Sequence, residues 1–240
     1  MNDTNVTAND YTSTDSVYLH ANPTWHAEDS AWKATQILKL IERNKLQPNS
    51  VVEIGCGAGE ILNQLQQRMA DKTVVFSGYE IAPDAFKLTK SREKERLHFY
   101  EEDLLQVEKK FDLLLMIDVF EHVEDYIGFV RKCKTKATYK IYHIPLDMSL
   151  WSILTNYPAS ARKQIGHLHY FMKDTALATL VDADQEIVDW FYTPGAFEVN
   201  NKGLSFTGKF IQLLRRFFYK VKPDFAVKAF GGFSLIVLTK

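Results

Sequence analysis

Short apolar runs alternate with helical apolar stripes along the middle of the chain. Runs rich in β-branched residues and leucine predict strands over residues 51–55, 73–79, 97–100, 111–117 and 139–144. Between them, apolar residues at a spacing of three or four predict helices over 59–70, 84–95 and 124–134. Strands that alternate with helices in this way are typical of a parallel sheet covered by helices on both faces. The pattern therefore predicts an α/β fold.

The pattern extends to both sides of this region. Trp32, Ile37 and Ile41 form a stripe that predicts a helix over residues 31–44, capped by Asp29 or Ser30. A further helix is predicted over residues 173–183, and further strands over 186–192 and 234–239. Residues 1–16 are rich in Asn, Thr, Asp and Ser and are predicted to be disordered, so the folded domain is expected to span residues 17–240.

Two segments, residues 146–172 and 194–232, do not follow the alternation of strands and helices. In open α/β sheets, ligands bind in the crevice at the carboxyl ends of the strands. Both segments leave from such ends or lie near them. We therefore expect these insertions to wall a substrate pocket.

Composition narrows the class of protein. The 240 residues are 46% hydrophobic and 25% charged, which is ordinary for a globular domain. No apolar run approaches the roughly 18 residues that a transmembrane helix needs, and residues 1–16 contain no apolar signal-peptide core. Cys56 and Cys133 are the two cysteines of the chain, so no disulfide framework is expected. These features predict a cytoplasmic location; they predict no oligomeric state.

Charge is distributed unevenly along the chain. Residues 200–240 carry +7 and residues 1–199 carry −8, for a net charge of −1. Within the basic part, residues 209–222 predict an amphipathic helix with an apolar stripe that includes Phe210, Leu213 and Phe217. One interpretation is a helix that packs on the core with a solvated basic face; the others are contact with an anionic membrane surface and recognition of an acidic acceptor. No nucleic-acid recognition motif is present, so no such partner is expected.

Three alternating glycines, Gly55, Gly57 and Gly59, separate the first predicted strand from the helix that follows. Glycines there allow close approach of a ligand, and the helix terminus presents free N–H groups. A dinucleotide fingerprint reads G-x-G-x-x-G, whereas here Glu60 stands where the third glycine would fall. An acid at that position disfavours a pyrophosphate, and no P-loop sequence is present. A cationic ligand with a carboxylate tail fits this turn better.

Four motifs in order over residues 51–123 resemble those of the class I S-adenosylmethionine-dependent methyltransferases. They are E-I-G-C-G-A-G at residues 53–59, G-Y-E-I at 78–81, E-E-D-L at 101–104 and the strand with its Glu-His-Val tail at 111–123. That tail is common in the branch that includes quinone-biosynthesis methyltransferases. The resemblance implies a Rossmann-like sheet of seven mostly parallel strands with the last one antiparallel, and S-adenosylmethionine as cofactor.

The resemblance also implies roles for individual residues. Glu53 is expected beside the glycine turn and the methionine ammonium, Glu80 and Ile81 at the ribose, and Asp103 and Leu104 at the adenine. Asp118 ends the most apolar strand, where it either faces the reaction crevice or caps a turn. Related enzymes often cover the methionine end with an N-terminal flap, so residues 17–50 are expected to supply one through Trp25 and His26, whose alternative is surface packing.

Histidines are the candidates for catalysis. His143 ends the fifth predicted strand, and His167 lies in a Gly-His-x-x-x-Phe segment that resembles one on the substrate side of many bacterial methyltransferases of this branch. We expect His167 or His143 to act as a base or to orient the acceptor, although a single histidine is more often structural. Glu121 and His122 fit a scaffold role as well as a catalytic one. Metal-requiring catechol-type relatives place Asp-Asn where this chain has Ile144-Pro145, so no metal is expected.

The sequence therefore predicts a methyltransferase that acts on oxygen or nitrogen of a small-molecule acceptor, such as a sugar or another metabolite. A second interpretation is a quinone-ring or lipid-like acceptor that is methylated at the membrane surface. A third, of another class, is a non-catalytic module that binds the cofactor and acts through partners. A nicotinamide oxidoreductase is disfavoured by Glu60 and the missing third glycine.

Overall fold

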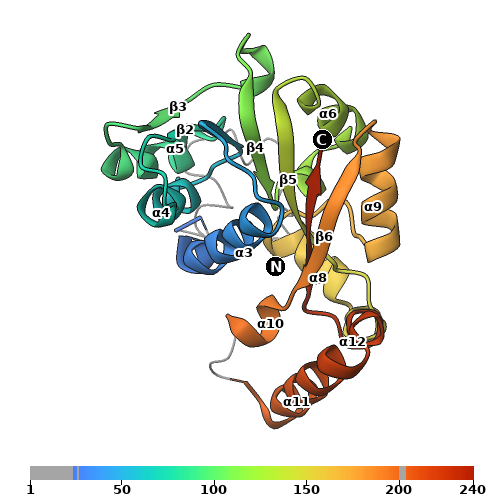
Figure 1. Cartoon of the computed structure of the whole chain (residues 1–240). Coiled ribbons are helices and arrows are strands. Elements are labelled where there is room, and N and C mark those ends of the chain that lie inside the picture. The colour runs from blue at the N-terminus through green and yellow to red at the C-terminus, as the bar shows by residue number, and fades with distance from the viewer. Residues whose placement is uncertain (1–23, 26, 200–203) are drawn as a thin grey trace.

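A seven-stranded sheet forms the centre of the molecule in the computed structural model, which describes residues 24, 25, 27–199 and 204–240 (Figure 1). Its strands are β1 (Ser50–Ile54), β2 (Val75–Tyr79), β3 (Leu97–Tyr100), β4 (Phe111–Ile117), β5 (Ala137–Pro145), β6 (Ile187–Thr193) and β7 (Ser234–Thr239). They lie in the order β3-β2-β1-β4-β5-β7-β6. Pairs among β1 to β5 are parallel, and β7 is antiparallel to both β5 and β6. The predicted Rossmann-like sheet with an antiparallel last strand is confirmed.

Alternate side chains of the central strands enter two separate hydrophobic cores. On β4, Leu113 and Leu115 belong to one core and Leu114 and Met116 to the other, and all four are buried. Successive side chains of a strand point to opposite faces, so a strand that is buried on both faces reads as a continuous apolar run. This accounts for the unbroken apolar pattern from which β4 was predicted.

Helices cover both faces (Figure 1). Apolar side chains of α3 (Ser30–Arg43) and α4 (Glu60–Arg68) pack in one core, and those of α6 (Tyr126–Cys133) and α9 (Lys173–Asp182) pack in the other. The predicted helix over 84–95 is shorter than expected: α5 spans Pro83–Thr89, and the 3-10 turn η2 ends it at Lys90–Arg92. Short 3-10 turns also precede α3 (η1, Ala27–Asp29), follow β3 (η3, Leu104–Gln106) and follow β4 (η4, Phe120–His122). The predictions for residues 1–16 and for His26 lie outside the described residues.

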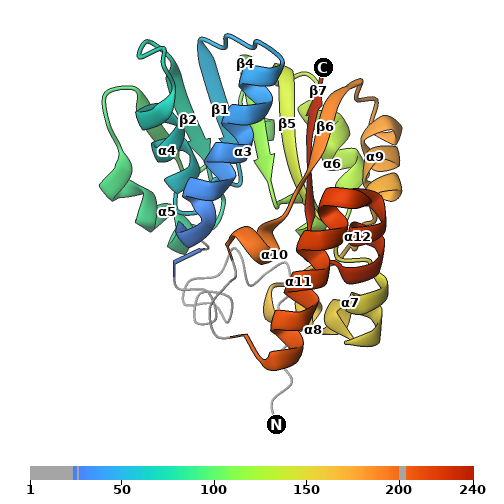
Figure 2. The same ribbon diagram turned by 60° about the horizontal axis from the view of Figure 1, so that its bottom comes forward.

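Both predicted insertions fold as helices beyond the ends of β5 and β6 (Figure 2). The first contains α7 (Leu150–Leu154) and α8 (Tyr157–Gln164), and the second contains α10 (Gly195–Glu198), α11 (Phe206–Val221) and α12 (Pro223–Phe230). α12 packs against both α11 and α7, so the two insertions meet at the same end of the sheet. Among the described helices, none combines the length and hydrophobicity that crossing a membrane requires.

Helix α11 presents its apolar stripe outward. Phe210, Leu213, Phe217 and Val221 are 55–64% exposed, whereas Gln212 on the opposite side is buried. Arg215 also faces inward, where its guanidinium donates to the carbonyl of Phe230 at 2.9 and 3.2 Å. The helix does pack on the core, but through Ile211, Phe218 and Tyr219 instead of the predicted stripe. The residues of the predicted stripe lie at the surface.

Lys33 ties α3 to the carboxyl end of β4. Its Nζ lies 3.0 Å from an oxygen of Asp29 and 2.8 Å from Oδ2 of Asp118, the residue that follows β4. Burial works to lower the pKa of Lys33, but the carboxylates of Asp118 and Asp29 outweigh burial and raise it. Burial likewise works to raise the pKa of Asp118, but His143 and Lys33 hold it well below its usual range. The helix is thus fastened to the sheet by charges that depend on one another.

Replacing Lys33 with Met leaves Asp118 and Asp29 without their lysine partner. Removal of one partner of a fully buried pair typically costs about 3–5 kcal/mol. Because the side chains of Lys33 and Asp118 are 12% and 26% exposed, we expect the free energy of unfolding to fall by about 2–3 kcal/mol at pH 7. The loss should shrink as the pH falls toward about 4. Asp118 of the variant then binds a proton, whereas Asp118 of the wild type, whose pKa is held lower by Lys33, stays ionised. Urea unfolding at several pH values measures both effects.

Lys39→Met is the matched control, because Lys39 is an exposed lysine on the same helix that contacts only Gln36 among the described residues. Its unfolding free energy should change by no more than about 0.5 kcal/mol. Equal losses of unfolding free energy in the two variants would contradict an electrostatic contact between α3 and β4. So would a loss in Lys33→Met that does not depend on pH.

Candidate active site

A cavity of about 470 Å³ lies at the carboxyl ends of β1, β2 and β4. Most of the predicted cofactor residues line it, namely Trp25, Glu53, Gly55, Gly57, Glu80, Ile81, Asp103, Leu104 and Asp118. Gly59 lies at its edge as the residue that caps α4. The glycine turn and the ends of the neighbouring strands therefore meet at one cavity, as the sequence predicted.

The glycine turn is held open by backbone geometry. Gly57 and Gly59 both have left-handed backbones, with φ of +53° and +75°. A Cβ on Gly59 would lie 2.4 Å from the ring of Phe99, whereas one on Gly57 would face open space as far as Trp25 at 3.9 Å. Gly59 is therefore needed for packing, while Gly57 leaves its backbone accessible from the cavity.

Glu80 spans the gap between the turn and the end of β2. One carboxylate oxygen accepts from the N–H of Gly57 at 2.8 Å, and the other accepts from the N–H of Ala82 at 2.8 Å. Burial raises the pKa of Glu80, although these N–H groups oppose the rise. The carboxylate is thus fixed in orientation at the wall of the cavity.

Glu53 is buried within β1 and lacks a full set of partners. Its Oε2 accepts no hydrogen bond from the described residues. Burial raises the pKa of Glu53 well above its usual value, Lys33 opposes the rise, and Glu80 adds to it. A buried carboxylate without a partner is costly, so this oxygen is available to a cationic or hydrogen-bonding ligand.

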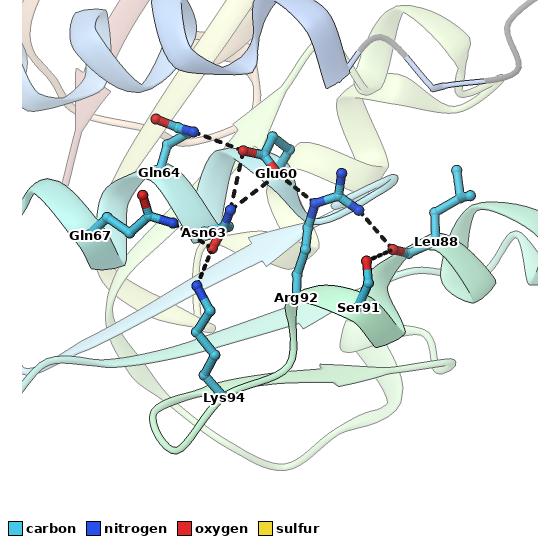
Figure 3. Close-up of polar contacts among 8 residues, drawn as sticks. All are labelled: Glu60, Asn63, Gln64, Gln67, Leu88, Ser91, Arg92 and Lys94. Atoms are coloured by element: carbon cyan, nitrogen blue, oxygen red, sulfur yellow. Dashed lines mark hydrogen bonds and ion pairs between the residues drawn. The ribbon is translucent and has the colours of Figure 1, made fainter.

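Glu60 stands at the N-terminus of α4 and forms a local network (Figure 3). Arg92 lies 2.5 Å from one of its oxygens, and Gln64 donates to the other at 2.8 Å. Burial works to raise the pKa of Glu60, but the hydrogen bonds from Arg92, Gln64 and Asn63 lower it. A stable negative charge therefore occupies the place where a dinucleotide-binding turn would hold pyrophosphate.

The lining of the cavity is strongly acidic. Seven carboxylate residues and one lysine, Lys33, contribute to it among the described residues, the acids being Glu53, Glu60, Glu80, Glu102, Asp103, Asp118 and Glu124. Such a lining opposes phosphate and favours positive charge. The sulfonium and ammonium of S-adenosylmethionine fit this arrangement, and the unpaired oxygen of Glu53 offers a partner for one of them.

A second cavity, of about 640 Å³, opens on the other side of Lys33 and Asp118, which line both cavities. Its other walls come from α3, from β5 and from the insertions, and include Trp32, His143, Asp147, Trp151, Tyr157 and Arg215. The two cavities are thus neighbours that share a charged pair. This arrangement can bring a donor and an acceptor together.

His143 lines the second cavity but is engaged at both ring nitrogens. Its Nδ1 lies 2.6 Å from Oδ1 of Asp118, and its Nε2 lies 2.9 Å from the hydroxyl of Thr193 on β6. The edge of Trp32 packs near the ring, with centroids 6.0 Å apart. The imidazole is therefore oriented by contacts from three elements.

His167 is buried away from the lining of both cavities. Its Nδ1 lies 2.5 Å from Oδ2 of Asp147, and its ring packs edge-on against His122 with centroids 4.8 Å apart. Asp147 lines the second cavity and His122 lines the first, so His167 contacts one residue of each cavity. Its role as a base stays a prediction.

Two residues of the site were missed from the sequence. The inward position of Lys33 could have been predicted from the sequence. Lys33 lies three residues after Ser30 and four before Ile37, on the side of the predicted helix that is buried. Asp147 has no such signal, because it lies in an insertion without periodicity. Its place beside His167 depends on the path of that loop.

A model of a methyltransferase domain matches residues 25–186 of the chain. No curated protein matches the sequence. Among solved structures, magnesium protoporphyrin IX methyltransferase from Synechocystis PCC 6803, crystallised with S-adenosylhomocysteine, is similar with a TM-score of 0.58 at 14% identity, over 95% of this chain and 88% of that one.

Two further structures show the same fold. The N-methyltransferase NodS from Bradyrhizobium japonicum, also in complex with S-adenosylhomocysteine, has a TM-score of 0.54 at 15% identity, over 96% of this chain and 94% of that one. A SAM-dependent methyltransferase from Archaeoglobus fulgidus has a TM-score of 0.56 at 17% identity, over 88% and 94%. Since the family match spans more than half of the chain, this protein belongs to the class I S-adenosylmethionine-dependent methyltransferases and has S-adenosylmethionine as its cofactor.

Proposed function

We propose that the protein transfers a methyl group to oxygen or nitrogen of a small-molecule acceptor held in the second cavity. The observation that carries the proposal is the pair of cavities that meet at Lys33 and Asp118. When bound, the cofactor supplies a methyl group on a sulfonium, so the protein has mainly to position the acceptor and exclude water.

Residues of the first cavity would hold the cofactor by charge and hydrogen bonds. Glu53 would accept from the methionine ammonium with its unpaired oxygen. Glu80, already fixed by Gly57 and Ala82, would accept from the ribose hydroxyls, and Asp103 would accept from the adenine amino group. Each of these groups lines the same cavity, which supports the assignment.

The second cavity favours a polar acceptor with a ring. Its lining combines the aromatic side chains of Trp32, Trp151 and Tyr157 with the polar groups of Asp147 and Arg215. Such a mixture fits a sugar or another polar metabolite. Segments 146–172 and 194–232 would then wall the acceptor pocket, since both contribute to this lining. His143, whose Nδ1 contacts Asp118, would take a proton of the acceptor at Nε2 through the hydroxyl of Thr193.

Replacing Glu80 with Ala should weaken binding of S-adenosylhomocysteine by about 10- to 150-fold, because two ligand hydroxyls lose their acceptor. Calorimetry measures the affinity. The loss should largely disappear with a 2′,3′-dideoxy analogue of the ligand, which separates ribose recognition from damage to the turn. Glu102→Ala is the control in the same cavity and should bind normally. Unchanged affinity of Glu80→Ala would remove this residue from the site.

Incubation with methyl-labelled S-adenosylmethionine and fractions of a small-molecule extract tests the function itself. We expect label to move into one low-mass compound, and His143→Gln to slow that transfer by about 10²–10⁴-fold while cofactor affinity stays normal. His98→Gln, an exposed histidine on β3, is the control. Cofactor binding without transfer to any fraction would support the non-catalytic module instead.

A lipid-like acceptor at a membrane surface is the second candidate, and the outward stripe of α11 favours it. Phe206, Phe210 and Phe217 are exposed on that helix, next to the exposed Lys209 and Arg216. Apolar residues flanked by basic ones are typical of helices that lie on anionic bilayers. Arg215 of the same helix lines the second cavity, so such contact would bring a lipid close to the acceptor site.

Sedimentation with vesicles tests this candidate. Binding should rise with the fraction of anionic lipid and fall steeply with added salt, because surface attraction is screened. Phe210→Ser with Phe217→Ser should weaken binding, while Val188→Ser, at an exposed position of β6, should leave it unchanged. If wild-type protein stays in solution at low salt with acidic vesicles, the candidate is excluded.

A further inference from the structure

Glu121 carries a buried carboxylate that the methyl-transfer scheme does not use. The residue is fully buried at 0% exposure in η4, and within the described residues neither of its oxygens accepts a hydrogen bond. The carboxylates of Asp118 and Asp147 lie near it and add negative charge to its surroundings. An unpartnered buried acid in acidic surroundings calls either for a proton or for a cation.

Two imidazoles lie next to this carboxylate. One ligand atom from each of Glu121, His122 and His167 can be chosen so that all three lie within 4.8 Å of one another. With bonds of about 2.1 Å in a tetrahedral site, ligand atoms lie about 3.4 Å apart, so the most distant pair would have to close by up to about 1.4 Å. Rotation of the side chains would supply this closure.

Asp147 places His167 in the orientation of a metal ligand. The carboxylate of Asp147, 2.5 Å away, accepts a hydrogen bond from the N–H at Nδ1. This leaves the lone pair of Nε2 for another partner. Histidine ligands of metals are commonly held by a carboxylate in this way. The contact fixes both the ring orientation and the tautomer.

Backbone hydrogen bonds hold the two parts of the cluster together. The carbonyl of Glu121 accepts from the N–H of Leu168 at 2.8 Å and from that of His169 at 3.1 Å. His167 therefore lies against η4 even though it is 46 residues away from Glu121 in the sequence. The cluster is built on paired backbone and is not an accident of surface side chains.

We propose that Glu121, His122 and His167 bind one divalent cation, with Asp147 as the residue that orients His167. Two imidazoles and one carboxylate favour a first-row transition ion such as Mn²⁺, Fe²⁺, Co²⁺ or Zn²⁺, with the remaining positions open to water or ligand. This assignment differs from the sequence-based expectation of no metal, which considered the residues after the fifth strand.

The position of the cluster suggests how the cation would act. His122 lines the cofactor cavity and Asp147 lines the acceptor cavity. A hydroxyl of the acceptor that replaces a metal-bound water would have a lowered pKa and would release its proton to solvent more easily. This role rests on the proposed methyl transfer and would narrow the acceptor to compounds with a coordinating hydroxyl, whereas binding of the cation does not depend on it.

Chelator-treated protein, without cofactor or acceptor, should take up one equivalent of Co²⁺ and show visible d–d absorption that Zn²⁺ removes. Glu121→Gln and His167→Gln should abolish uptake at equimolar metal. Asp147→Asn should weaken it by about 10–100-fold, the usual effect of losing an orienting partner. Because the measurement needs no turnover, its failure is separate from failure of the proposed function.

His169→Gln is the matched control, since His169 is a neighbour in the same segment whose Nε2 instead contacts the carbonyl of Val123 at 2.9 Å. It should bind Co²⁺ like the wild type. No uptake by the wild type, together with unchanged thermal stability of Glu121→Gln, would overturn the proposal. That pair of results would mean that Glu121 is held as a neutral acid.

Discussion

The half-buried contact of Lys33 with Asp118 is the interaction on which the site depends. Charges removed from water are tolerated only when they are paired and hydrogen-bonded. Lys33 satisfies Asp118 from α3, His143 satisfies it from β5, and Thr193 satisfies His143 from β6. Four elements are thus positioned by one chain of polar contacts, and both cavities are built around it.

The excess of carboxylates in the first cavity explains why it favours a positively charged ligand. The first cavity collects carboxylates from the ends of three strands, and the acid at Glu60 is stabilised by Arg92. Where no internal cation is available, as at Glu53 and Glu121, buried oxygens are left without partners. Such orphaned groups are costly for folding, and binding of a positive ligand is the event that can compensate for that cost. Stability and ligand recognition are therefore coupled in this half of the molecule.

Helix α11 of the second insertion has an inward polar contact side and an outward apolar side. Arg215 and Gln212 of α11 face inward and make hydrogen bonds, which leaves Phe210 and Phe217 outside. A contiguous apolar surface of this kind on a single chain usually marks an interaction site. Arg215 on the inward side of the same helix lines the second cavity, so the helix lies between that cavity and the molecular surface.

The sequence by itself determined the sheet, most helix positions and most of the predicted residues that line the first cavity. Strand periodicity, the glycines and acids such as Glu80 are local signals, and parallel strands bring their carboxyl ends together whatever the loops do. Tertiary structure decided the rest. It turned the apolar stripe of α11 outward, engaged His143 on both nitrogens, and set His167 beside Asp147 and Glu121. These outcomes depend on how non-periodic insertions pack and on which buried charges find partners, and neither property is written in local spacing.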